Sequence, residues 1–422
     1  MDFLVLPVHL FDKKYLDNSL HYIIWEHPHY FKSYRYNKKK LMLHRASCKY
    51  YYNYLKEAKI KCSYVEFNKT PKLKKYKIWD PIDKIKLPGT PQIVESPNFI
   101  LTLSDYANYR KKTSKFFFNS FYMWGKKLKQ IIPEQKSTDK KNRNKLTKSL
   151  KIPPVQKLPT NKYTAEAARY VNKNFSKNYG NTEGFMFPTT HEDAKKFLKN
   201  FLKNKLTHFG KYQDAIDKSD NTLFHSLLST SLNIGLLNPL EIIPQILKKR
   251  TFMNNKEGFI RQLFWREYQR YCYIYFSFRG NYFGNTKKLS IKWYNAKTNI
   301  EPLDICIKNA WDTGYLHHIE RLMIVGNFMN LSGIHPKEGF KWFMEFSCDS
   351  YEWVMHQNVL EMVFFISGGA TMRRPYISSS NYILKMSNYK KGEWSDKWDQ
   401  LYHNFIARNK IKMKKFKYYY RT

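Results

Sequence analysis

The spacing of apolar residues differs between the two ends of this chain, and the difference limits the folds that it can adopt. Residues 1–130 contain short apolar runs of strand type and one long helical pattern, whereas the pattern from Tyr163 onward is mainly helical. Strands that alternate with a helix favour a parallel sheet. We therefore expect an α/β domain over residues 1–130 and an all-helical domain over residues 164–422. The expected strands are Phe3–Val8, Tyr22–Trp25 and Cys62–Phe67, and the early helix is Lys40–Lys59.

Residues 131–163 differ from both flanking parts. Lys and Asn dominate this segment, prolines interrupt it, and apolar residues are sparse. It is typical of a basic interdomain linker, either solvated or lying along DNA. The helices expected beyond it are Tyr163–Phe175, His191–Leu206, Leu240–Arg250, Asn255–Phe276, Gly314–Leu331, Pro336–Cys348 and Asp396–Arg408.

The charge balance is strongly basic. Lys and Arg number 74 against 34 Asp and Glu, a net charge of +40. Such a field attracts polyanions, and nucleic acid is the obvious candidate. The abundance of Lys, Asn, Tyr, Ile and Phe is also typical of AT-rich coding sequence, so charge alone does not decide the partner.

Cysteine usage and the N-terminus bear on the compartment. The five cysteines form no CxxC pair, which favours a reducing compartment over a disulfide scaffold or a cysteine-only zinc site. The first residues lack a basic leader, and no apolar run approaches the length of a membrane helix. We expect no membrane association and no secretion. The expected location is intracellular, with access to DNA: cytoplasm, nucleus or a viral replication site.

A charged group interrupts the apolar segment that follows Gly314. On a helix, His317 and His318 lie four and three residues before Arg321, so the three side chains can share one side among apolar neighbours. A buried cation needs a partner, and Asp349 is a plausible one. The same residues are compatible with a structural ion pair and hydrogen-bonded histidines. The absence of HxxxH spacing speaks against a metal site.

Two further segments permit both a functional and a structural interpretation. Hydroxyls at Ser226, Ser229 and neighbouring positions suit a phosphate, but they also suit ordinary helix caps. Trp265 and Glu267 belong to a helix that lines a pocket in one interpretation and is an amphipathic surface helix in the other.

Taken in order, these segments resemble the photolyase/cryptochrome superfamily. The similarity is greatest to the photolyase-related branch that includes bacterial iron–sulfur (6-4) photolyases. It implies a Rossmann-like α/β antenna-type domain followed by an all-α FAD-binding domain. The segments that carry the resemblance are Phe209–Ala215, His225–Ser229, Trp265–Glu267, His317–Arg321, Asp349, Gly368–Gly369 and Pro375–Ser387, with Lys40–Ser47 and Cys62–Phe67 in the N-terminal half.

The resemblance also implies roles for individual residues. Arg321 and Asp349 would form an ion pair beside the isoalloxazine ring, and His317 and His318 would face the lesion as catalytic residues. A histidine pair resembles (6-4) photolyases, since cyclobutane-dimer enzymes more often have Asn second, and imidazole can donate a proton near neutral pH. Trp265 and Glu267 would line the pocket for flavin and substrate. The residues that would hold the flavin phosphates and ribityl chain are Tyr212, Ser226, Leu227, Leu228 and Ser229.

Two features depart from the family pattern. The iron–sulfur relatives bind a 4Fe-4S cluster through four cysteines, but here only Cys306 is near a matching position and no cysteine follows Cys348. A 4Fe-4S cluster is therefore not expected. Counting from Asp349 places Met355 next to flavin N5, and a thioether is a poor hydrogen-bond partner for that N–H.

The function that the resemblance implies is light-driven repair of UV-damaged DNA. The chain would be a deoxyribodipyrimidine photolyase, a lyase acting on carbon–carbon bonds, with FAD as chromophore and with (6-4) lesions favoured over cyclobutane dimers. The alternatives are an FAD-binding, cryptochrome-like photoreceptor and a flavin-free nucleic-acid-binding relative. A monomer is expected. The sequence does not identify an antenna chromophore.

Overall fold

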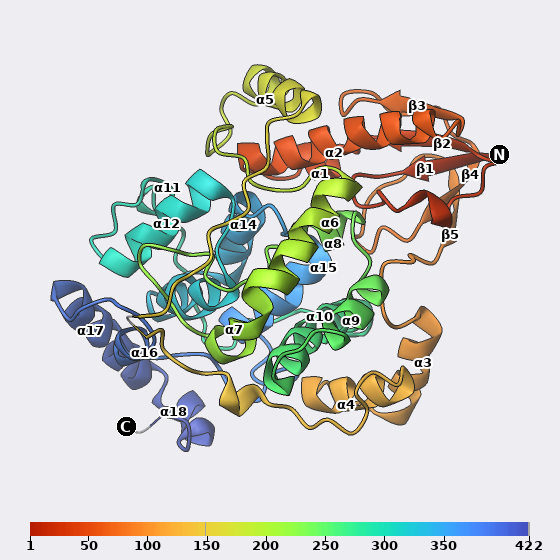
Figure 1. Cartoon of the computed structure of the whole chain (residues 1–422). Helices are drawn as coiled ribbons and strands as arrows, with labels where there is room; N and C mark the ends of the chain where they lie inside the picture. The colour runs from red at the N-terminus through yellow and green to blue at the C-terminus, as the bar shows by residue number, and fades with distance from the viewer. Residues whose placement is uncertain (148, 421–422) are drawn as a thin grey trace.

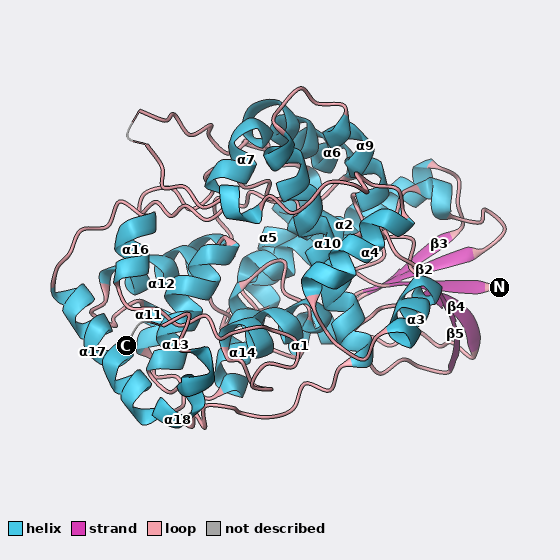
Figure 2. Ribbon diagram, turned by 90° about the horizontal axis from the view of Figure 1, so that it is seen from below, coloured by secondary structure: helices cyan, strands magenta, loops and turns pink. Residues whose placement is uncertain are grey.

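A small sheet lies at one end of a largely helical molecule. The computed structural model describes residues 1–147 and 149–420. The N-terminus lies at the sheet, while α17 (Glu393–Arg408) and α18 (Lys410–Met413) lie at the opposite end (Figures 1 and 2). One contiguous core of buried apolar residues runs from Phe3 in the sheet to Phe405 in α17. The division into domains at residues 130 and 164 stays a prediction.

The sheet has five parallel strands in the order β3-β2-β1-β4-β5. Leu4 in the central strand pairs with Ile23 on one side and with Ile78 on the other. The three expected strands are confirmed, in shorter form, as β1, β2 and β3. The strands β4 and β5 were not expected, because lysines and a proline interrupt their apolar pattern. The bounds are β1 Asp2–Val5, β2 His21–Trp25, β3 Cys62–Val65, β4 Lys75–Trp79 and β5 Thr90–Val94.

The helices that follow β2 and β5 differ in their neighbours. The expected early helix is confirmed as α2 (Lys38–Glu57), which begins where the Asn37 side chain accepts from the Lys39 N–H and packs on β2 and β3. By contrast, α4 (Phe118–Leu128) packs against α10 (Met253–Tyr275) of the helical part. The helix α5 (Lys162–Asn174) returns to lie along α2 (Figure 1). The α/β part and the helical part are therefore interleaved.

The segment expected as a linker has little regular structure, but part of it is anchored. It contains the short turn η2 (Asp139–Lys141). The Thr138 N–H donates to the Glu257 carboxylate of α10 at 3.0 Å, and the Asn254 amide of the same helix donates to Asn142 at 3.1 Å. This stretch therefore lies on α10.

The helical part supplies most of the remaining elements. The helix expected over Gly314–Leu331 is shorter than predicted, because Gly314 ends the preceding helix α12 with a left-handed φ of +69° and the next helix begins only at His318. The other bounds are α1 His29–Lys32, α3 Leu103–Lys112, α6 His191–Asn200, α7 Leu206–Tyr212, α8 Ser229–Ile234, α9 Pro239–Leu247, α11 Lys292–Asn295, α12 Glu301–Thr313, α13 Asn327–Leu331, α14 Pro336–Phe346, α15 Glu352–Met355, α16 Asn381–Met386, and the 3-10 turns η1 Lys13–Tyr15 and η6 Lys414–Phe416.

Three helical stretches in the described residues have the wide turn of a π-helix: η3 (Phe201–Lys205), η4 (Glu320–Gly326) and η5 (His356–Val363). Such turns insert an extra residue and often occur at functional sites. Two of the three supply walls of the cavity described below.

All five cysteines are free thiols. In the part of the chain that is described, no helix combines the length and the apolar character needed to cross a bilayer.

Candidate functional site

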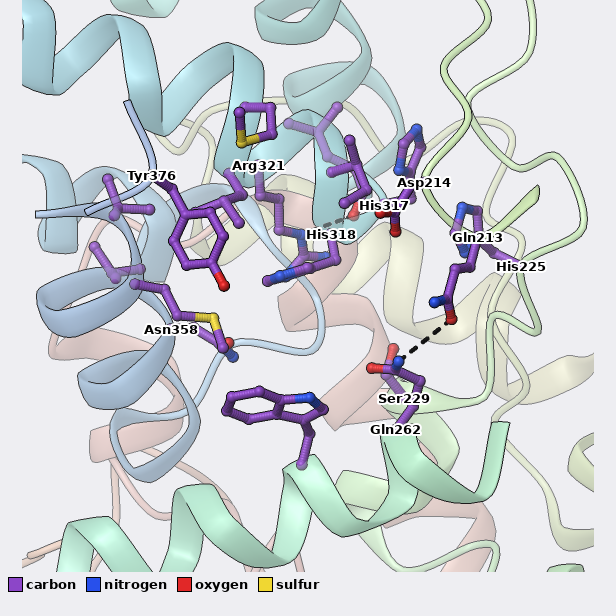
Figure 3. Close-up of a pocket in the computed structure, with 18 of the residues that line it drawn as sticks. Gln213, Asp214, His225, Ser229, Gln262, His317, His318, Arg321, Asn358 and Tyr376 are labelled. Atoms are coloured by element: carbon purple, nitrogen blue, oxygen red, sulfur yellow. Dashed lines mark hydrogen bonds between the residues drawn. The ribbon is translucent and has the colours of Figure 1, made fainter. Parts of the chain in front are cut away.

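A cavity of about 700 Å³ lies within the helical part, bounded by the α7–α8 connection, α10, η4, η5 and the segment from Arg374 to Met386 (Figure 3). This volume is within the range of small-molecule and cofactor sites. Most of the side chains predicted for the site line it: Ser226, Leu227, Ser229, Trp265, His317, His318, Arg321, Asp349 and Met355.

The predicted pairing of Arg321 with Asp349 is confirmed. Arg321 lies on η4, and its Nη1 donates to the Asp349 Oδ1 at 2.9 Å while its Nε donates to the Leu316 carbonyl at 2.7 Å. The Ser347 hydroxyl donates to the same Asp349 oxygen at 2.5 Å. Burial alone would raise the pKa of Asp349, but the Arg321 guanidinium and the hydroxyl donors hold this pKa below its usual value. The carboxylate is therefore ionised in the wall of the cavity.

A second set of hydrogen bonds fixes the backbone at Asp349. The Asn233 amide of α8 donates to the Asp349 carbonyl at 3.1 Å. In turn, Arg266 of α10 donates from Nε to the Asn233 Oδ1 at 3.0 Å and from Nη1 to the Asn98 carbonyl at 2.7 Å. Arg266 thus ties α10, α8 and the end of the α/β part to the residue that pairs with Arg321.

The two adjacent histidines occupy different environments. His317 precedes the helix and is buried, and its ring stacks on that of His225 with centroids 4.6 Å apart and planes 16° apart. His318 is exposed to the cavity. The expectation that His317 and His318 share one side of a helix with Arg321 is wrong for His317, because the left-handed turn at Gly314 delays the helix start to His318.

Burial sets the protonation of this group. Desolvation lowers the pKa of His317 well below its usual value, with His225 and His318 adding to the effect. The walls of the cavity lower the pKa of His318 to about 4 in the same way. Because His318 is exposed to the cavity, solvent reduces this lowering of its pKa. Both imidazoles are therefore neutral at pH 7, and each donates through one ring N–H rather than as an imidazolium.

Beside them, Glu320 is also desolvated. Burial raises the pKa of Glu320 to about 8. The His317 backbone N–H, which donates to Glu320 Oε2 at 3.2 Å, lowers this pKa but does not offset the effect of burial. The carboxyl group is therefore largely protonated at neutral pH.

Trp265 and Glu267, which are two positions apart on α10, point to different surroundings. Trp265 lines the cavity and stacks on Phe118 of α4, with centroids 3.7 Å apart and planes 10° apart. Glu267 lies outside the cavity, fully buried, where it accepts from the N–H groups of Ile100 and Leu101 and from the Tyr106 hydroxyl. The expectation that Glu267 lines the pocket is therefore wrong.

Tyr212 and Leu228 are also absent from the cavity wall. The Tyr212 ring packs on Phe224, with centroids 5.7 Å apart, in a small separate cluster that residues of the 131–163 segment cover. Leu228 is fully buried in the main core. Both residues support the cavity-lining segment from behind.

The region expected next to flavin N5 contains a thioether and an amide. Met355 and Asn358 both line the cavity, and Figure 3 shows Asn358. His356 does not, because its Nδ1 contacts the Glu352 carbonyl at 2.7 Å and its ring packs against Tyr273. Asn358 is thus the residue of this stretch that brings a hydrogen-bonding side chain to the cavity.

Several cavity residues were not predicted. Gln213 and Gln262 face each other, with Gln262 Nε2 donating to Gln213 Oε1 at 3.4 Å (Figure 3). Burial raises the pKa of their neighbour Asp214 to about 6. Basic residues also line the cavity, namely Arg143, Arg261, Arg374 and Lys385. The paired arginines before Pro375 were a visible signal for Arg374, whereas nothing local marked Arg143 in a segment already rich in lysine.

No cluster of three or more His, Cys, Asp or Glu side chains in the described chain is arranged to hold a metal ion. Cys306, which the resemblance placed near a cluster position, is buried and lies near Tyr389.

Comparison with known proteins gives three consistent results. The profile of the deoxyribodipyrimidine photo-lyase-related protein family matches residues 3–81 and 74–187. A (6-4) photolyase of Agrobacterium fabrum is 36% identical over 296 residues, which are 65% of this chain and 58% of that protein, so the chain spans little more than half of that relative's length. Uncharacterized protein R855 of Acanthamoeba polyphaga mimivirus is 58% identical over 93 residues, covering 22% of this chain and 76% of that protein.

The fold agrees with these sequence matches. The crystal structure of a bacterial class III photolyase from Agrobacterium tumefaciens superposes with a TM-score of 0.61, covering 99% of this chain and 89% of that chain. At 15% identity, this likeness concerns the fold alone.

Proposed function

We propose that this chain, which belongs to the deoxyribodipyrimidine photo-lyase-related protein family, is a light-driven DNA photolyase that uses FAD to reverse UV-induced pyrimidine lesions, with (6-4) lesions preferred. The observation that carries the proposal is a single cavity that brings together the Arg321–Asp349 pair, Trp265 and an accessible His318. The proposed partner is UV-damaged DNA, and the chain is proposed to act as a monomer.

The residues present suit a flavin dinucleotide. The cavity is large, and it has both apolar and polar walls. Buried ring nitrogens of His225 and His317, at its edge, have no hydrogen-bond partner in the described chain, as expected at a site built for a polar ligand. Ser226, Leu227 and Ser229 would hold the phosphates and ribityl chain, while Arg321 and Asp349 would flank the ring system. When bound, FAD supplies light absorption and electron transfer.

The protein's own groups would position the lesion and assist proton transfer. His318 would donate its ring N–H to the lesion, with His317, braced by His225, behind it. The ring of Trp265 would offer an apolar face to an extruded base, which costs less energy to flip when it is damaged. Arg143, Arg374 and Lys385 would attract the phosphates of the strand. Glu267 would act as a positioning residue rather than as a substrate contact.

Two other functions stay open for the same site. A cryptochrome-like photoreceptor would bind FAD without repairing DNA. A flavin-free relative would bind nucleic acid alone, and Met355 in the cavity wall is the observation that favours it.

Flavin uptake and lesion choice test the proposal together. The purified chain is incubated with FAD and freed of excess cofactor, and its flavin is reduced chemically in the absence of oxygen. It is then assayed under light on oligonucleotides that carry a (6-4) photoproduct or a cyclobutane dimer. We expect bound flavin and loss of the (6-4) adduct. His318→Ala should abolish that loss, while His403→Ala, on the exposed face of α17, should not. Lack of flavin after reconstitution would exclude both flavin-dependent functions, and unchanged repair by His318→Ala would refute the role of the pair.

A further inference from the structure

Lys205 is a buried cation that the site described so far does not use. It ends the π-helical stretch η3 and is only 3% exposed. Its ammonium has no hydrogen-bond partner in the described chain. Asp220 supplies the favourable negative charge near the Lys205 ammonium. The Oδ1 atom of Asp220 accepts from the Thr222 hydroxyl and the Leu223 N–H and makes no hydrogen bond with Lys205. A buried ammonium without a partner is costly, so its presence calls for a compensating anion.

Lys205 does not line the main cavity but lies behind one of its walls. Lys205 lines a second, much smaller cavity of about 10 Å³, which has room for about one water molecule. His225, Ser226 and Leu227 line both this rear cavity and the main cavity. One short segment of chain therefore separates the ammonium from the proposed flavin site.

The geometry of η3 directs this particular lysine inward. Lys203 lies on the same π-helical stretch and is exposed, whereas Lys205 is buried two residues later. Val155 and Gln156 of the 131–163 segment also line the rear cavity. The ammonium nitrogen itself is buried from solvent, which strengthens any electrostatic interaction that it makes.

We propose that Lys205 is an anion-binding residue that attracts the diphosphate of the dinucleotide cofactor to the His225–Leu227 segment, an inference that rests on the proposed use of FAD. The diphosphate would supply the negatively charged hydrogen-bond partner that Lys205 lacks in the described chain. Before it binds, the unpaired ammonium destabilises the fold. After it binds, the same charge contributes to affinity and selects a phosphorylated flavin over an uncharged one.

The protonation of the lysine agrees with this role. Burial lowers the pKa of Lys205 to about 8, with Asp220 opposing the shift. The ammonium is therefore still present at pH 7, and binding of an anion would raise its pKa again.

Two measurements on matched variants test the inference. Lys205→Met removes the buried charge, Lys205→Gln keeps a polar end without charge, and Lys203→Met is the exposed control. The melting temperature of each apoprotein is measured with and without inorganic pyrophosphate, and FAD affinity is measured by fluorescence quenching. We expect pyrophosphate to stabilise the wild type and Lys203→Met but neither Lys205 variant. FAD affinity should fall by about tenfold or more in both Lys205 variants, equivalent to a lost charge interaction.

The stability of the apoprotein distinguishes this role from a structural one. Lys205→Met should melt at the same or a higher temperature than the wild type, whereas loss of a structural lysine would lower it. Equal stabilisation of all variants by pyrophosphate, or none of the wild type, overturns the inference. If the wild type takes up no FAD, the proposed function fails, and the pyrophosphate series still decides whether Lys205 binds an anion.

Discussion

Replacing Asp349 by Asn tests the buried ion pair in the cavity wall. Arg321 would keep its 2.7 Å bond to the Leu316 carbonyl but lose the charged acceptor at 2.9 Å. Each side chain is 13% exposed, so solvent can compensate only slightly. A hydrogen bond to a charged group contributes about 1.5–3 kcal/mol, and breaking a buried pair costs about 3–5 kcal/mol. Because the Asn oxygen can still accept, we expect a loss of about 2–3 kcal/mol.

Urea unfolding at neutral pH measures this loss, with Asp312→Asn at an exposed position as the control. The control should change the free energy of unfolding by less than about 0.5 kcal/mol. Since the pKa of Asp349 is lowered in the folded state, the contribution of the pair is present above the unfolded pKa and is lost as the pH falls through the folded pKa. A loss equal to that of the control would refute the buried pair.

Three further substitutions probe the surroundings of the site. Glu320→Gln should become progressively more stable than the wild type as the pH rises from about 4.5 to about 8, because in this window the unfolded state ionises while the folded state keeps Glu320 protonated, which thermal melts across this range would show. Glu267→Ala should lose about 3 kcal/mol in urea unfolding, since it orphans three buried donors, and a loss below about 0.5 kcal/mol would contradict these buried hydrogen bonds. Gly210→Ala should lower the melting temperature, because its Cβ would lie 2.4 Å from the Asn254 carbonyl oxygen, and an unchanged melt would contradict the close contact of α7 with α10.

The sequence predicted the Arg321–Asp349 pair because a charge in an apolar helical segment must find a partner. It could not place His317, whose position depends on Gly314. At that glycine the chain turns with positive φ, and an added Cβ would lie 2.5 Å from the Cys348 Sγ. This close contact is tertiary, so no local pattern around the histidines reveals it.

Helix phase explains why Glu267 does not line the cavity. Trp265 and Glu267 lie two positions apart and therefore on different sides of α10, so only Trp265 reaches the cavity. The π-helical turns η3, η4 and η5 shift the phase of the residues that follow them, and the wide turns depend on tertiary packing rather than on local composition. The stacking of His225 on His317 joins residues 92 positions apart (317 − 225) and was likewise invisible in the sequence.

The sheet was predicted where strands are apolar and missed where they are not. The strand β1 is almost entirely buried, so its composition is nearly continuous in apolar residues. In β5, by contrast, three of five residues are exposed, and the strand includes Pro91 at the edge of the sheet. Edge strands of this kind carry little hydrophobic signal.

The proposed function is light-driven, flavin-dependent repair of UV-damaged DNA. The most direct test is the fraction of a (6-4) photoproduct that the FAD-reconstituted protein, with its flavin chemically reduced, converts under near-ultraviolet or blue light, compared with an identical sample kept in the dark. We expect loss of the adduct only in the illuminated sample, with the original pyrimidines restored. A protein that carries reduced flavin and binds the lesion but converts none of it under light would contradict the proposed photolyase function.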